Sequence, residues 1–401
     1  MTQKDILELA LNEELYALQT ESLNHWISKV DNASAFYYLV VQYRKDPSQE
    51  NIKTKILEHI NSFTTGGNEP SFNIGHTWSY PMIVNGVALL KKSPLWNEIE
   101  TETIEKINCL MKGFAYLLHY ACDKDNNYET GLRRTMHWGK HWSPNCYANL
   151  LLYAMCLCDY FGGREAFAEL FISFNYDNYI ADLKKFNFTH ALKTFSTPAI
   201  ETEYFTIPSA KEILEGTATE QFHVEELKDT TNYSYGGEGK GIKREFLYSL
   251  RKPTPASGWD IVRGVASRMY KLPCASSIEF SNGIAKIIDE TVSPEEGKIG
   301  MFYELNQAWR SGRSSINHAM IDFAIMTSSM YAMKELKLMD IPKEPMLSTL
   351  YERIRVGNDD LIYKLEHGYQ PYIDGPRAIT YESNHAGYLF WKDIWQNDLQ
   401  K

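Results

Sequence analysis

Apolar residues recur at three- and four-residue spacing through most of the chain, as they do in helices that bury one face. The spacing predicts helices at residues 3–20, 34–43, 50–62, 81–90, 101–122, 164–174, 318–339, 346–366 and 388–397. Residues 146–161 are almost wholly apolar, which indicates a helix in the interior of a multi-layer protein. We therefore expect an all-α fold.

Helical patterns run from one end of the chain to the other, and the chain has no Gly/Ser linker, low-complexity segment or sharp internal repeat. A length of 401 residues suggests two domains as a prior but also fits one large helical toroid. With helix pairs from end to end, we expect a single domain over residues 1–401, an (α/α) toroid of helical hairpins. Residues 176–220 mix short helical stretches with Thr, Ser and Pro, and we expect them to form a lid-like excursion. We expect a few short strands around residues 276–305.

Composition is that of an ordinary globular protein, with 44% apolar and 23% charged residues. The 41 basic and 51 acidic residues give a net charge of −10, which disfavours nucleic acid as a partner. The same charge disfavours an acidic polysaccharide, so local arginines and lysines would have to receive one. No apolar run approaches the roughly 20 residues of a membrane-spanning helix, and we expect no membrane partner.

The six cysteines lack paired spacing: Cys109, Cys122, Cys146, Cys156, Cys158 and Cys274. Cys156 and Cys158 lie in an apolar helical pattern, where a reduced, buried thiol is usual. The sequence as given also carries no secretory signal. These features predict a cytoplasmic protein, or a secreted one if a signal is missing from the sequence.

Aromatic and polar residues gather in three loops, at residues 73–81, 130–145 and 229–268. In a ring of helical hairpins such loops meet at one mouth, where a cleft can form. Four loop tryptophans could stack on sugar rings: Trp78, Trp138, Trp142 and Trp259. The alternative is that each tryptophan packs at an end of the helical core and has only a structural role.

Two further patterns suggest a bound metal or nucleotide, and both are incomplete. His137 and His141 have the spacing of ligands on one helical face, but no Glu follows His137, no third ligand is evident and Gly139 interrupts the helix. The glycine-rich run 236–241 lacks the Ser or Thr and the preceding apolar strand of a phosphate-binding loop. We expect neither a metal nor another cofactor.

The loop at 229–268 brings phenols and guanidinium groups together: Tyr233, Tyr235, Arg263 and Arg268. A carbon acid beside a carboxylate is hard to deprotonate unless the developing enolate is stabilised. Arginine or a hydrogen-bonding asparagine supplies that stabilisation, and a nearby cation lowers the pKa of a tyrosine that acts as the base. This chemistry is β-elimination at a uronic acid. The alternative is a structural pairing of the arginines with Asp260 and Glu245.

The segment Gly258–Arg268 resembles the Asp-x-Val-Arg-Gly-Arg-x-Ile-Ser-Arg segment of the chondroitin, hyaluronate and xanthan lyases, polysaccharide lyase family eight. The catalytic domain of that family is an (α/α) toroid. Residues 76–83 resemble its Asn-Trp-Trp aromatic loop, and residues 232–239 resemble its Tyr-x-Gly-x-Tyr-Gly turn. The chain departs from the family at Val265 and Thr77, lacks the Asp-Gly-Ser before the histidine, and lacks the large β domains.

This resemblance implies roles for six catalytic residues. Asn145 and Arg263 would neutralise the carboxylate, and Tyr233 or Tyr235 would take the C5 proton and protonate the leaving oxygen. His223 or His141 would assist. The residues expected to bind substrate are His76, Trp78, Trp142, Trp259 and Arg268.

The sequence therefore predicts an enzyme that acts on a polysaccharide or oligosaccharide, in the first place a lyase. One alternative is a toroidal glycoside hydrolase that acts on unsaturated oligosaccharides, which needs two carboxylates roughly 5–10 Å apart. Candidates for that pair are Asp260, Glu238 and Glu304. The other alternative is a helical scaffold that binds a glycan or a protein without catalysis.

Overall fold

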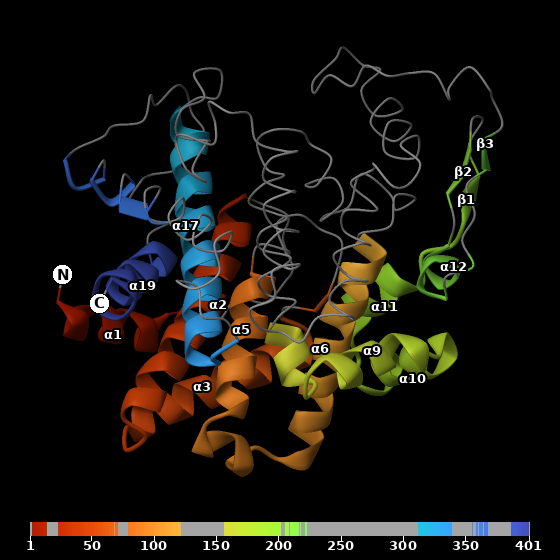
Figure 1. The fold of residues 1–401 in the computed structure, drawn as a ribbon, viewed down its shortest axis with the longest axis horizontal. Helices are drawn as coiled ribbons and strands as arrows, with labels where there is room; N and C mark the ends of the chain where they lie inside the picture. Colours follow the sequence, from red (N-terminus) through yellow and green to blue (C-terminus); the bar gives the residue numbers. More distant parts are fainter. Residues whose placement is uncertain are drawn as a thin grey trace.

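The structure is a computed structural model. It describes residues 2–13, 23–67, 69–70, 79–121, 156–201, 205–207, 209–215, 217, 221–222, 312–338, 355, 358–359, 361–363, 365–367 and 386–400. The described residues are helical apart from turns and one small sheet, so the predicted all-α class is confirmed (Figure 1).

The described residues of the first third of the chain form five helices and two short turns. They are α1 (Gln3–Asn12), α2 (Leu23–Lys45), α3 (Glu50–Ser62), the π-helical turn η1 (Phe63–Gly67), α5 (Tyr80–Lys91), the 3₁₀ turn η2 (Pro94–Glu98) and α6 (Thr101–Ala121). α3, α5 and α6 match the predicted ranges to within one residue. α2 begins eleven residues before its predicted start, and α1 ends well before residue 20.

Later described helices are α9 (Arg164–Ile172), α10 (Tyr176–Lys185), α11 (Thr189–Phe195), α12 (Ala210–Leu214), α17 (Gly312–Glu335), α19 (Ala386–Ile394) and the π-helical turn η7 (Trp395–Leu399). Residues 156–160 are also helical. The strands β1 (Ile200–Glu201), β2 (Phe205–Ile207) and β3 (Gln221–Phe222) form an antiparallel sheet in that order. The sequence did not predict this sheet, and the strands expected around 276–305 fall outside the described residues.

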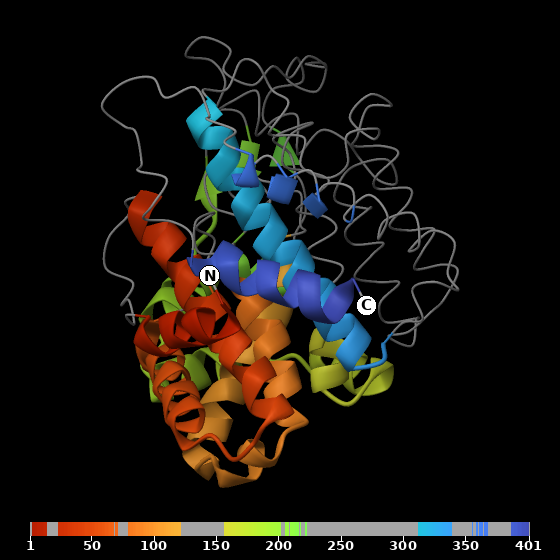
Figure 2. The same ribbon diagram turned by 90° about the vertical axis from the view of Figure 1, so that its left-hand side faces the viewer.

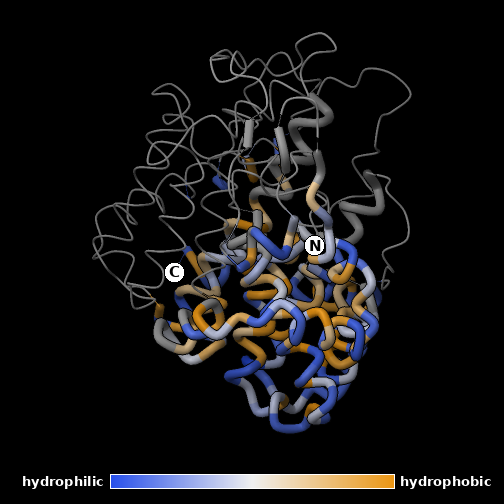
Figure 3. Tube along the Cα trace, turned by 90° about the vertical axis from the view of Figure 1, so that its right-hand side faces the viewer, coloured by the Kyte–Doolittle hydropathy of each residue, from blue (hydrophilic) through white to orange (hydrophobic). Residues whose placement is uncertain are grey.

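The core is centred on α2, α5 and α17. Every residue of α5 from Tyr80 to Leu90 is buried, as are the stretches 31–41 of α2 and 323–333 of α17. Figure 3 shows apolar residues inside the described bundle and hydrophilic residues along its outer turns. Burial of a helix on all sides is typical of the inner layer of a multi-layer helical protein.

α2 and α17 run in the same direction. The Tyr37 hydroxyl donates to the Ser328 carbonyl at 2.9 Å, and seven residues further along both helices Arg44 pairs with Glu335 at 3.4 Å. Figure 2 shows the two helices sloping the same way. The Tyr37 contact is buried in the apolar core, and a polar contact of this kind fixes how two helices align along their axes.

α5 shares this direction, while α6 runs the opposite way. Tyr80 at the start of α5 packs on Phe114 late in α6, with ring centroids 4.7 Å apart. At the other end of α5 the Lys91 ammonium donates to the Tyr160 carbonyl, and the Tyr160 hydroxyl donates to Asn108 near the middle of α6.

The ends of α2 and α5 are linked through the start of α3. Lys53 pairs with Glu98 in η2 at 2.6 Å, and Tyr43 near the end of α2 lies within electrostatic reach of Lys53. α2, α5 and α17 therefore begin at one end of the core, where α6 finishes. We call this the entry end.

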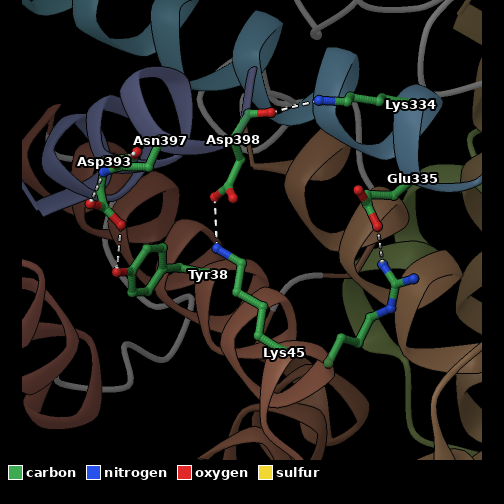
Figure 4. A network of polar contacts seen from close by, with 8 residues as sticks. Tyr38, Lys45, Lys334, Glu335, Asp393, Asn397 and Asp398 are labelled. Carbon is green, nitrogen blue, oxygen red and sulfur yellow. Dashed lines mark hydrogen bonds and ion pairs between the residues drawn. The ribbon is translucent and has the colours of Figure 1, made fainter. Parts of the chain in front are cut away.

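Hydrogen bonds and an ion pair connect the C-terminal segment to α2 and α17 (Figure 4). The Tyr38 hydroxyl donates to the Asp393 carboxylate at 2.9 Å, and the Lys45 ammonium pairs with Asp398 at 2.7 Å. Lys334 of α17 donates to the Asp398 carbonyl at 2.6 Å. Residues more than 350 positions apart in sequence are thus joined, which places α19 and η7 against the inner helices.

Cys109 and Cys156 are free and buried, which confirms the expectation for Cys156. Cys158 is disulfide-bonded, so the expectation of a reduced thiol is wrong at this position; its partner lies outside the described residues. Sequence spacing does not reveal such a bond because folding, rather than proximity in the chain, brings the two thiols together. Among the described helices, none is both long and apolar enough to span a membrane.

Candidate functional site

All eleven residues predicted to act on substrate lie outside the described residues. They fall in three segments of the chain: 71–78 with His76 and Trp78, 122–155 with His141, Trp142 and Asn145, and 223–311 with His223, Tyr233, Tyr235, Trp259, Arg263 and Arg268. His137, the other half of the histidine pair, also lies in the second segment. The described residues contain no group of three or more His, Cys, Asp or Glu side chains that could hold a metal.

Each of these three segments joins a described helix at the entry end of the core. The first leads into α5, which begins at Tyr80. The second leaves α6 at Ala121, and the third leads into α17 at Gly312. One side of each segment therefore adjoins the entry end, while residues 156–160, which follow the second segment, lie at the opposite end of α5. That the three loops share one mouth of the core stays a prediction, since the loops themselves lie outside the described residues.

The described residues at the entry end include a buried contact between the two sides of segment 71–78. The Tyr80 hydroxyl donates to the backbone carbonyl of Glu69 at 2.9 Å, and both residues are buried. Pro70 packs against α6 so closely that a Cβ added at Gly113 would lie 2.7 Å from the proline Cγ. Tyr80 packs on the next α6 residue, Phe114. Both sides of the segment therefore rest on one turn of α6.

The Glu69 side chain caps a helix elsewhere in the chain. Its carboxylate accepts the Ala191 N–H at 2.9 Å and further backbone hydrogen bonds from His190 and Thr189, at the start of α11. Removal from water raises the pKa of Glu69, and this effect outweighs the three N–H groups that act to lower it. A carboxylate at a helix N-terminus is favoured by the exposed N–H groups and the helix dipole.

Asp31 of α2 caps α19 in a similar way. Its carboxylate accepts the Gly387 N–H at 2.8 Å, and burial raises its pKa from 3.8 to about 8, with a smaller contribution from the charge of Glu13. Gly387 permits this approach, because a Cβ there would lie 2.7 Å from the Asp31 oxygen and 3.1 Å from the Ser34 hydroxyl.

Sequence reasoning did not find either buried carboxylate. Glu69 stands in a Gly, Thr and Pro break between helices, where an acidic residue usually faces solvent, and Asp31 lies in a polar stretch that gave no helical signal. The helices that they cap begin 120 or more residues further along the chain. One local signal was used correctly, since Pro81 stands in the first turn of α5 as predicted.

Comparisons with known proteins give one informative match. The chain is 25% identical over 359 residues to a gellan lyase from a Bacillus species, and this alignment covers 86% of the chain and 13% of that protein. The chain thus spans a small part of the length of the curated relative that it matches. No protein-family model matches the chain, and no solved structure matches it. The similarity supports a relationship to a polysaccharide lyase.

Proposed function

We propose that this chain is a polysaccharide lyase that performs β-elimination next to a uronic acid. The observation that carries the proposal is the similarity to a gellan lyase over 86% of the chain. It is supported by the resemblance of residues 258–268 to the arginine segment of polysaccharide lyase family eight.

The proposed reaction removes the C5 proton of the uronic acid and breaks the bond between C4 and the glycosidic oxygen, which leaves a C4–C5 double bond. Asn145 and Arg263 bind the carboxylate and stabilise the negative charge that develops as the proton leaves. Tyr233 or Tyr235 takes that proton as a phenolate and returns it to the leaving oxygen. His223 or His141 assists the transfer.

Substrate binding is assigned to the aromatic and basic residues of the same three segments. Trp78 and Trp142 hold sugar rings by stacking, together with His76 and Trp259. Arg268 offsets the net charge of −10, which would otherwise repel an acidic polymer. One side of each segment adjoins the entry end, which is compatible with a shared site, because residues of one site have to be delivered to one place.

The test is ultraviolet absorbance at about 235 nm during incubation with gellan and with hyaluronan, chondroitin, heparan, alginate, xanthan and pectate. Elimination creates a double bond conjugated to the carboxylate, which absorbs there, whereas hydrolysis creates none. Tyr233→Phe, Tyr235→Phe and Arg263→Ala are compared with wild type. Tyr176→Phe, whose hydroxyl donates to the Phe195 carbonyl in α11, is the matched control for a lost phenol.

We expect the absorbance to rise with wild type and with the Tyr176→Phe control. Loss of the rise in Arg263→Ala and in one of the two loop tyrosine variants would support the mechanism and identify the base. A folded wild type that releases reducing ends without the absorbance change would refute elimination and favour hydrolysis.

A further inference from the structure

We propose that the contact between Asp31 and the start of α19 is a pH-sensitive latch, in which docking of the first turn of α19 on α2 takes up a proton at Asp31. The docked turn is then favoured in acid and becomes less favoured as the pH rises. Asp31, Ser34 and Gly387, which form the latch, are all described by the structure, and the latch does not depend on the proposed activity.

The latch is one end of a longer contact between α2 and residues 386–400. The polar pairs of this contact are Asp31 with Gly387, Tyr38 with Asp393, and Lys45 with Asp398, of which the last two appear in Figure 4. Their α2 members are spaced by seven residues, which is about two helical turns, so they lie on one face of α2. Asp31 therefore holds the beginning of α19, while the other two pairs hold its end and η7.

The surroundings of Asp31 oppose its ionisation in the docked state. The side chain is buried and accepts the Gly387 N–H at 2.8 Å. The charge that acts on it from α1 is that of Glu13, which has the same sign. Burial is the larger effect, and together the two raise the pKa of the carboxyl group from 3.8 to about 8, against the lowering effect of the Gly387 hydrogen bond.

Other titratable groups of residues 386–400 have contacts of their own. Tyr388 packs on Phe323, Lys392 pairs with Glu366, Asp393 accepts the Tyr38 hydroxyl, and Asp398 pairs with Lys45. The group of α19 that faces Asp31 is the backbone N–H of Gly387. This N–H stays a donor at every pH, so the protonation of the latch depends on Asp31 itself.

The backbone of the first turn covers the Asp31 carboxyl group. A Cβ at Gly387 would lie 2.7 Å from the Asp31 oxygen and 3.1 Å from the Ser34 hydroxyl, so this approach requires a glycine. Lifting the turn removes that cover and lets water reach the carboxyl group.

The first turn can lift while the rest of α19 stays packed. Gly387 has no side chain to bury, and Leu389 is only partly buried. Phe390, Trp391 and Ile394 are completely buried further along the helix. Because buried apolar surface resists opening, the start of α19 should open at a lower free-energy cost than its later turns.

Opening is coupled to release of the proton. Once the turn lifts, the pKa of Asp31 returns towards 3.8 from about 8 in the docked state. The opening equilibrium constant then rises by up to about tenfold for each pH unit between these values and levels off above about pH 8. From pH 5 to pH 7 the expected increase is up to about a hundredfold.

The experiment is hydrogen–deuterium exchange of the full chain at pH 5, 7 and 9, for wild type and Asp31→Asn. One peptide covers residues 386–390, and a second covers residues 50–62 of α3 as the report on global unfolding. An asparagine can accept the Gly387 N–H but takes up no proton. The ratio of the wild-type rate to the Asp31→Asn rate at each pH cancels the intrinsic pH dependence of exchange, because the peptide sequences are identical.

Tyr38→Phe is the matched control within the same contact. It removes a buried hydrogen bond to Asp393 and leaves Asp31 in place. Burial raises the pKa of Tyr38 above its usual value, so this phenol does not titrate between pH 5 and pH 9. The rates of Tyr38→Phe should therefore differ from those of wild type by the same factor at each pH.

Support would be a ratio for residues 386–390 that rises from pH 5 to pH 7 and levels off above pH 8, with no such rise for residues 50–62. An equal rise in both peptides would overturn the latch, because the whole molecule would then be opening. If Asp31→Asn does not fold, wild-type rates corrected for intrinsic exchange have to show the same rise in residues 386–390 alone. A pH dependence that persists in Asp31→Asn would assign the proton to another group and overturn the proposal.

Discussion

Replacing Asp31 by Asn should stabilise this protein, and the gain should grow with pH. Asp31 is fully buried, accepts the Gly387 N–H, and has a pKa raised from 3.8 to about 8 mainly by desolvation. An asparagine keeps an oxygen that can accept the Gly387 N–H and takes up no proton on folding. The substitution therefore removes the cost of taking up a proton on folding while keeping the cap of α19.

The size of the effect follows from the two pKa values. At pH 7 an unfolded Asp31 is ionised, whereas the folded side chain is protonated, and each pKa unit corresponds to about 1.4 kcal/mol. The pH lies about three units above the ordinary pKa of 3.8, so folding takes up a proton at a cost of about 4 kcal/mol. Stability from this group is fully present below about pH 4 and is lost as the pH rises to about 8.

The assay is urea unfolding of wild type and Asp31→Asn at pH 5, 7 and 9, followed by circular dichroism. The difference in unfolding free energy should increase from pH 5 to pH 7, reach several kcal/mol, and level off above about pH 8. Comparing two variants at each pH cancels the titration of all other groups. A difference that is the same at pH 5 and pH 9 would refute the reasoning, since Asp31 would then titrate alike in both states.

Asp46→Asn is the control of opposite sign. Asp46 is exposed, and hydrogen bonds from Ser48 and Gln49 lower the pKa of its carboxyl group. A lowered pKa stabilises the folded state above the ordinary pKa, so this substitution should cost stability at neutral pH and lose its effect in acid.

Three further predictions concern the core. Gly113→Ala should destabilise the protein by about 1–3 kcal/mol in urea unfolding, because the added Cβ meets Pro70 and Tyr179; unchanged stability would contradict the close packing. Burial lowers the pKa of His59 to about 3, so wild type should lose thermal stability as the pH falls from about 6.5 to about 3, because protonation of this histidine opposes folding. His59→Leu should lose less stability over this range. An equal loss in both proteins would show that other groups cause it. Reduction with dithiothreitol should lower the melting temperature by breaking the Cys158 disulfide, worth about 2–4 kcal/mol, and non-reducing peptide mapping should identify the partner cysteine.

Local pattern was enough to predict α3 and α6, because their apolar residues recur at helical spacing and face one core. In α3 these are Ile52, Ile56 and Ile60, all buried. It was not enough for α2, where polar residues such as Asp31 and Asn32 are buried among helices and break the expected alternation. Their burial depends on segments distant in sequence, such as Gly387, and no local window contains that information.

The same distinction between local sequence patterns and contacts distant in sequence applies to the candidate site. Residue chemistry in the sequence suggested elimination and named Tyr233 and Arg263, and these stay predictions because they lie outside the described residues. The contact between Glu69 and Tyr80 was not predicted, although Tyr80 was recognised within an aromatic loop. Its basis is three-dimensional, since the Glu69 carboxylate is held by a helix that starts 120 residues later.

The two long-range caps have a physical cost that local caps avoid. Thr2 in α1 and Asn175 in α10 satisfy the first N–H groups of their own helices from exposed positions. Glu69 and Asp31 do the same for α11 and α19 from buried positions, where desolvation raises both pKa values. Such a residue adds less to stability than a neutral acceptor would, yet it fixes where a distant helix begins relative to the core. A Glu69→Gln variant keeps an oxygen that can accept the Ala191 N–H and avoids the desolvation that raises the pKa of the carboxyl group. It should therefore be at least as stable as wild type in urea unfolding at neutral pH, and a clear loss of stability would show that an amide cannot replace the carboxyl group as the cap of α11.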